Sequence, residues 1–141
     1  MKKIILLFSL CVCILSVSAK DDLPKYVHNW KLKSMNGKAV EGQCNLKIDA
    51  LGQYSGSGFC NNYAGNFVFD GKKKVTASPN MISTKKMCDA KMQEETEYFA
   101  TLPKITGYKI DKNTLYMMAE KEIILEFERI EDAAPKGKKK K

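Results

Sequence analysis

Short stretches in which apolar and polar residues alternate make up most of the chain after residue 26. A period of two is typical of half-buried β-strands, because successive side chains point to opposite faces of a sheet. The turn signals Asn36-Gly37 and Asp70-Gly71 lie between such stretches and favour β-hairpins. The pattern predicts at least seven short strands, within residues 27–32, 44–48, 54–57, 65–69, 74–77, 106–110, 114–118 and 123–127.

One segment has helical spacing instead. Asp89 is the predicted N-cap and Pro103 helps to end the helix, while Glu94, Glu95 and Glu97 lie in its first half, where they suit the helix dipole. The residues that follow one another at helical spacing are Met92, Thr96, Phe99 and Leu102. Many short strands with one helix predict an α+β fold, mainly antiparallel β, in which the helix packs against a small barrel or sandwich.

The N-terminus has the composition of a secretory leader. Lys2 and Lys3 precede an apolar run over residues 4–17, and Val17-Ser18-Ala19 has the small residues of a cleavage site. Residues 1–19 are therefore predicted to be a signal peptide that is cleaved after Ala19. The apolar run is short for an uncleaved anchor. A lipoprotein is disfavoured because the residues before the leader cysteines Cys11 and Cys13 are not small.

The remaining chain divides into one domain, residues 20–131, and a lysine-rich tail, residues 132–141, which we expect to be disordered. The 24 basic and 16 acidic residues give a net charge of +8, but the leader and the tail carry most of the excess. The lysines within Lys136–Lys141 could make a weak contact with an anionic surface. Specific nucleic-acid binding is disfavoured because no aromatic residues are interleaved with them.

Three cysteines remain after the leader, Cys44, Cys60 and Cys88, and an oxidising compartment would join two of them. Three pairings are possible. The flanks of Cys60 and Cys88 resemble loops or element ends that could bring two Cβ atoms together, so we favour this disulfide. Cys44 begins an alternating stretch and is expected to be a small buried hydrophobe.

No catalytic or metal-binding set emerges from the sequence. His28 is the single histidine, and pairs of His28 with Ser57 or with Cys44 are both weak candidates for nucleophilic catalysis. The cysteines are too widely spaced for a zinc site, and the six methionines after the leader give little support to a copper site. The glutamates of residues 120–128 resemble a solvated strand face. We therefore expect no enzymatic activity and no cofactor.

The most specific motif covers residues 54–67, Tyr-Ser-Gly-Ser-Gly-Phe-Cys-Asn-Asn-Tyr-Ala-Gly-Asn-Phe. It resembles the META domain (HslJ-like) signature S-G-x-x-G-C-N-x-x-x-G-x-[YF], and residues 84–88 resemble the family's T-x-x-x-C. The similarity extends from Trp30 to Arg129. The residues that match are Ser55, Gly56, Cys60, Asn61, Gly65, Phe67, Thr84 and Cys88. Phe59 departs from the family glycine, and we expect it to pack under its own loop rather than to form an exposed aromatic contact.

The resemblance implies a small barrel-like META domain with one packed helix and no established enzymatic activity. Family members are associated with stress response, the cell envelope, secretion and antibiotic tolerance. It therefore predicts a non-catalytic, secreted or periplasmic module that binds a protein or envelope partner through its β surface or the loop 56–65. Separately, we expect a monomer. In that loop we expect glycines in an unusual backbone conformation, Asn61 bonded to the backbone and a cysteine pair as a lock. A binder of a lipid or small apolar ligand inside the barrel, or a small hydrolase or thiol enzyme, are the alternatives.

Overall fold

The computed structural model describes residues 23–131, so the predicted leader 1–19 and tail 132–141 lie outside the described residues. The helix α1 (Met92–Thr101) is followed by a 3-10 turn, Leu102–Lys104, that contains Pro103. The strands are β1 (Asn29–Met35), β2 (Lys38–Ala39), β3 (Asn45–Ile48), β4 (Gln53–Ser57), β5 (Asn62–Phe69), β6 (Val75–Ala77), β7 (Ile82–Ser83), β8 (Gly107–Asp111), β9 (Thr114–Ala119) and β10 (Glu122–Ile130).

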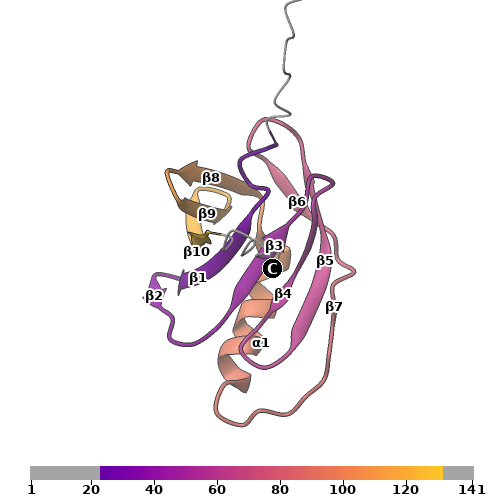
Figure 1. Cartoon of the computed structure of the whole chain (residues 1–141), viewed down its shortest axis with the longest axis vertical. Helices are drawn as coiled ribbons and strands as arrows, with labels where there is room; N and C mark the ends of the chain where they lie inside the picture. The colour runs from indigo at the N-terminus through magenta and orange to yellow at the C-terminus, as the bar shows by residue number, and fades with distance from the viewer. Residues whose placement is uncertain (1–22, 132–141) are drawn as a thin grey trace, which may run out of the picture.

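The strands form one curled antiparallel sheet in the order β6-β5-β4-β3-β1-β10-β9-β8, with β2 beside β1 and β7 beside β5. The two end strands approach each other at one place, where Lys74 forms a bridge with Gly107. There the Val75 N–H donates to the Thr106 carbonyl at 3.0 Å, and the Tyr108 N–H donates to the Lys73 carbonyl at 3.0 Å. The sheet is therefore a curled half-barrel, and the predicted α+β fold is confirmed (Figure 1).

The core lies between the concave face of this sheet and α1, which passes behind β3 and β4 in Figure 1. Buried residues alternate with exposed ones along β1 and β3, as the period of two predicts. The largest fully buried side chains include Trp30, Phe67, Tyr98 and Phe127. Burial of such large apolar side chains stabilises the fold by roughly 25 cal/mol per Å² of apolar area.

Both hairpin signals are confirmed. Asn36 and Gly37 join β1 to β2 with positive φ values of 49° and 77°, the combination that a two-residue type I′ turn requires. The Asp70-Gly71 signal lies between β5 and β6, which pair in antiparallel register. These turns are local features, so their short sequences were sufficient to predict them.

The helix differs from its prediction at its start and on its buried face. It begins at Met92, and the N-cap residue is Lys91, without a side-chain cap, so Asp89 is not the N-cap. Asp89 lies in a separate turn before the helix, in which the Lys91 N–H donates to the Cys88 carbonyl at 3.1 Å. The residues that α1 buries are Glu95, Tyr98 and Thr101, whereas Thr96 is exposed and Met92 is half-buried. The predicted face is right at Phe99 and Leu102, which pack in the core, and wrong at Thr96. Glu95 turns inward in its place and hydrogen-bonds partners that the sequence pattern does not show.

The loop predicted over residues 56–65 was also too long. Residues 53–57 belong to β4 and residues 62–69 to β5, so only residues 58–61 form the turn. The strands β2 and β7 have two residues each and were not predicted, because two residues are too few to show an alternation.

Candidate functional site

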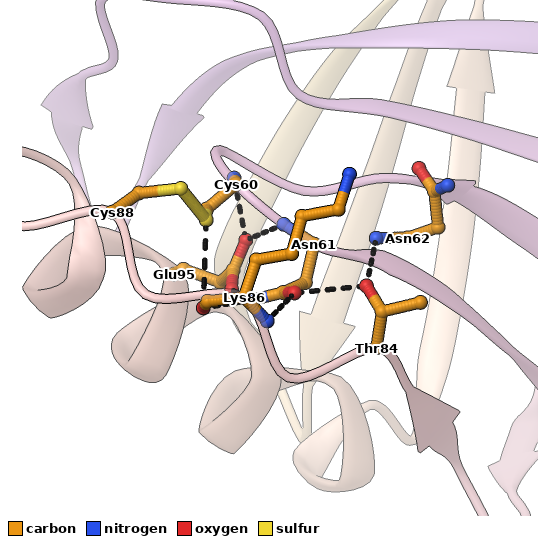
Figure 2. The surroundings of a disulfide bond; sticks show 7 residues. All are labelled: Cys60, Asn61, Asn62, Thr84, Lys86, Cys88 and Glu95. Atoms are coloured by element: carbon orange, nitrogen blue, oxygen red, sulfur yellow. Dashed lines mark hydrogen bonds between the residues drawn. A yellow bond between two sulfur atoms is a disulfide. The ribbon is translucent and has the colours of Figure 1, made fainter.

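The turn between β4 and β5 is tied to the segment that precedes α1. We call residues 78–91, which run from β6 to the helix, the connector. A disulfide joins Cys60 of the turn to Cys88 of the connector, with a Cα–Cα distance of 6.0 Å (Figure 2). This is the pair that the sequence favoured. Cys44 is left as a free and buried thiol.

The carboxylate of Glu95 lies under the turn and accepts three hydrogen bonds. Its Oε2 accepts from the backbone N–H groups of Cys60 and Asn61, both at 2.7 Å. Its Oε1 accepts from the Asn61 side-chain amide at 2.6 Å (Figure 2). Glu95 is 2% exposed, so all three bonds form in a buried environment. A side chain of α1 thereby satisfies backbone donors that the turn leaves unpaired.

Asn61 links the same turn to the connector. Its Oδ1 accepts from the Thr84 hydroxyl at 2.8 Å and from the Lys86 N–H at 2.6 Å. Its Nδ2 also donates to the Lys86 carbonyl at 3.1 Å, and the Thr84 hydroxyl oxygen accepts from the Asn62 N–H at 3.1 Å. We call Cys60, Asn61, Thr84, Lys86 and Glu95 the Glu95 network. Together with the disulfide it cross-links the turn, the connector and the helix (Figure 2).

The Glu95 network keeps its carboxylate ionised. Burial alone would raise the pKa of Glu95, but the hydrogen bonds from Asn61 and Cys60 outweigh burial, so the pKa is lower than its ordinary value of 4.5. Neither ion pair among residues 23–131 involves Glu95. Its charge is therefore compensated by aligned amide dipoles rather than by a cation.

The motif glycines are required for close approach rather than for backbone conformation. None of Gly56, Gly58 and Gly65 has a positive φ, so the expected unusual backbone is wrong. A Cβ at Gly58 would lie 2.7 Å from Oε2 of Glu95, and one at Gly56 would collide with the carbonyl oxygen of the neighbouring strand β3. A Cβ at Gly65 would collide with a tyrosine ring on β4. The glycines therefore let side chains and backbone pack directly on the turn.

Phe59, which replaces the family glycine, is half-buried and points into the protein. Its ring lies edge-on to that of Tyr98, with 6.5 Å between the centroids, and it also faces Gly42. Phe59 therefore packs between the turn, α1 and the segment around Gly42.

The matched motif residues separate into two groups in the structure. Cys60, Asn61 and Thr84 belong to the Glu95 network, whereas Phe67 is in the core and Ser55 is exposed on β4. The sequence analysis missed the roles of Glu95 and Lys86. Glu95 lies three residues before Tyr98, so helical spacing places both on one face of α1, and this was the available signal. Because Glu94 and Glu97 flank it, the sequence did not show which of the three glutamates faces the core.

A second buried polar chain lies deeper in the core. The Tyr63 hydroxyl donates to the Asn45 carbonyl at 2.8 Å and lies 2.6 Å from the Tyr98 hydroxyl. Because Tyr63 has one proton and uses it on Asn45, Tyr98 donates to Tyr63. The Cys44 thiol contacts the Tyr98 hydroxyl, and burial raises the pKa of Cys44 to about 12. The thiol is therefore protonated at neutral pH and has almost no access to solvent.

The other candidate groups make ordinary contacts. The Ser57 hydroxyl donates to the Asn62 side chain at 3.0 Å, and the ring of His28 packs edge-on against Trp30. Within residues 23–131, no group of three histidine, cysteine or acidic side chains is placed to hold a metal ion. No helix in the same range is long and apolar enough to cross a membrane.

The connector also exposes apolar side chains next to the Glu95 network. Ile82 is 71% exposed and Met87 is 81% exposed. A shallow hollow of about 310 Å³ lies beside Ile82 and is lined by Asn62, Tyr63, Ala64, Ile82, Ser83 and Thr84. The connector therefore presents two apolar side chains to solvent beside the Glu95 network.

The fold and the site define an antiparallel half-barrel whose helix and β4–β5 turn are joined by a disulfide and a buried carboxylate. The META domain profile matches residues 22–132, and the chain belongs to the META domain family.

Solved structures share this fold at low sequence identity. A DUF4847 family protein from Bacteroides vulgatus is 18% identical, with a TM-score of 0.58 over 77% of this chain and 94% of that one. A protein from Burkholderia xenovorans, solved by NMR, is 22% identical, with a TM-score of 0.57 over 74% of this chain and 82% of that one. At this identity the similarity establishes the fold alone. No curated protein matches the chain.

Proposed function

We propose that this META-domain protein is a non-catalytic binding module that acts outside the cytoplasm, secreted or in the periplasm, in the envelope stress response. The Cys60–Cys88 disulfide supports this compartment, because such bonds persist where the environment is oxidising. The leader-like composition of residues 1–19 supports it as well.

The observation that carries the proposal is the exposed apolar surface on a rigid connector. Ile82 and Met87 face solvent, while the disulfide and the Asn61 bonds to Thr84 and Lys86 hold the backbone that bears them. A surface that is already ordered loses little conformational entropy on binding, so more of its contact energy appears as affinity. Such a surface suits a protein partner.

The remaining chemistry favours binding over catalysis. Cys44 is a buried, protonated thiol, and a nucleophile must be accessible and readily ionised. The space between sheet and helix is filled by aromatic rings such as Tyr63, Phe67 and Tyr98. This packing favours a partner on the surface over a lipid inside the half-barrel. The lysines within Lys136–Lys141 would add a weak contact with an anionic surface, separate from the contact with that partner.

Site-specific crosslinking in the native envelope fraction tests the proposal. A photo-crosslinking amino acid is placed at Ile82 and, as the matched control, at Leu51, which is 78% exposed in the turn before β4. We expect one protein to be captured from Ile82 and not from Leu51. The full-length and tail-deleted baits should capture it equally.

Two results would contradict the proposal. Equal capture from both positions would show that the connector is not a preferred surface. Capture by the full-length bait alone, lost as salt rises, would assign binding to the lysine tail, because exposed charges are screened by salt.

A further inference from the structure

The connector presents one edge of its backbone to β5 and the opposite edge to solvent. The Thr84 N–H donates to the Asn62 carbonyl at 3.0 Å. The N–H and the carbonyl of Lys86 both bond to the side-chain amide of Asn61. Ile82 pairs with Ala64 in the same antiparallel register. Because successive residues of such a ladder alternate in direction, the peptide groups of Ser83 and Lys85 point away from β5.

This outer edge of β7 is unused within the described part of the chain. No hydrogen bond there involves the N–H or the carbonyl of Ser83 or Lys85, and β7 has β5 as its one neighbouring strand. Natural edges are often twisted away or covered. Here the connector is attached on both sides of β7, by the bond from the Ser78 N–H to the Asn66 carbonyl at 2.8 Å before it and by the disulfide from Cys88 to Cys60 after it.

The side chains around this edge define the kind of strand that would fit it. The hollow of about 310 Å³ beside Ile82 offers an apolar site for one side chain of an added strand. Lys85 and Lys86 directly follow the edge, and both side chains are exposed. An acidic strand is therefore complementary in charge.

We propose that the outer edge of β7 binds an extended, acidic peptide segment of a partner protein as an additional strand. The added strand would bond to the peptide groups of Ser83 and Lys85 and place one apolar side chain in the hollow beside Ile82. Main-chain bonds would give affinity, and the hollow and the lysines would give specificity. This inference rests on the proposed binding function and names its partner class.

Fluorescence anisotropy with the oxidised full-length protein tests this directly. The probe is a labelled eight-residue peptide of alternating valine and threonine with glutamate at both ends, compared with the same peptide carrying lysine at both ends. We expect the acidic probe to bind at least tenfold more tightly than the basic one. A lack of preference, or no binding of either probe, would overturn the proposal.

Two variants of Ser83 separate the edge from the rest of the surface. Ser83→Pro removes the outward N–H and leaves the bonds of Ile82 and Thr84 to β5 in place. Ser83→Ala retains that N–H. We expect the acidic probe to lose at least tenfold in affinity with Ser83→Pro and to be unchanged with Ser83→Ala. Equal binding to the two variants, at unchanged melting temperature, would overturn strand addition.

A double variant, Lys85→Glu with Lys86→Glu, tests the role of charge, because both lysine side chains are exposed beside the edge. The double variant should reverse the preference and bind the basic probe more tightly.

Two other ligands could occupy the edge instead, a second copy of the chain or a lipid surface. Self-association is therefore measured by sedimentation, and lipid binding is measured with phosphatidylglycerol vesicles. Self-association lost in Ser83→Pro, or vesicle binding without peptide binding, would overturn the acidic-peptide proposal. Capture at Ile82 that Ser83→Pro does not reduce would refute strand addition while leaving the proposed function standing.

Discussion

The strongest structural test is the replacement of Glu95 by glutamine, which changes the charge and one acceptor while nearly preserving shape. In Glu95→Gln the amide oxygen can occupy the position of Oε2 and still accept from the N–H groups of Cys60 and Asn61. The new NH₂ group then faces the Asn61 side-chain amide, which is a donor to Oε1 at 2.6 Å in the natural protein. The side-chain amide of Asn61 cannot rotate by 180° to present its oxygen instead, because that oxygen already accepts from the Thr84 hydroxyl and the Lys86 N–H.

The expected cost follows from these three bonds. Hydrogen bonds to a charged group contribute about 1.5–3 kcal/mol each, roughly twice as much as neutral ones. The variant loses one such bond to a contact between two donors and weakens the other two. We expect the free energy of unfolding to fall by about 3 kcal/mol, which for a domain of this size lowers the melting temperature by about 10 °C.

Urea unfolding at pH 7 with the disulfide intact measures this free energy. The matched control is Glu94→Gln, one residue earlier on α1, whose carboxylate is half-exposed and pairs with Lys91 at 3.0 Å. The control should leave the urea midpoint close to that of the natural protein, because a solvent-exposed ion pair contributes little to stability. If Glu95→Gln were as mild as the control, the view that the carboxylate holds the turn would be refuted.

The pH dependence gives an independent check with a definite sign. The pKa of Glu95 is lower in the folded protein than its ordinary value of 4.5. Its stabilising contribution is therefore complete above pH 4.5 and is lost as the pH falls through the folded-state pKa. The difference in unfolding free energy between the natural protein and Glu95→Gln should narrow below pH 4.5. A constant difference would contradict the assignment of an ionised carboxylate.

Three further predictions follow from the covalent and packing constraints. Cys60→Ala with Cys88→Ala opens a loop with a sequence separation of 28 and should lower the unfolding free energy by about 3–4 kcal/mol in urea titration, whereas an unchanged midpoint would contradict this. Gly56→Ala should lower the melting temperature more than Gly71→Ala, because a Cβ at Gly56 collides with backbone, whereas one at Gly71 has open space and meets only the strain of a φ of 76°; equal losses would count against it. Protein from its native compartment should show no thiol reactive to Ellman's reagent when folded and one, Cys44, when denatured without reductant. Three thiols would argue against the disulfide and export.

The hairpins and the strand alternation could be predicted from the sequence because they depend on neighbouring residues. Asn36-Gly37 adopts positive φ values at little cost, whatever the rest of the fold does. The disulfide was favoured among three pairings, because Cys60 and Cys88 lie at element ends whereas Cys44 lies beside β3. The Glu95 network could not be predicted, because its partners are more than 20 residues apart in the chain.

The sequence by itself determined the strand period, the turns, the family and the residues of the motif. Only the tertiary structure decided which glutamate of α1 turns inward. Glu94, Glu95 and Glu97 are alike as residues, and helical spacing favoured a face through Met92 and Thr96 instead. The fold brings the N–H groups of Cys60 and Asn61 to Glu95, and the carboxylate there gives these buried donors a partner. The tertiary structure alone also shows that β7 has an open edge, because no local sequence pattern indicates on which side a strand has a neighbour.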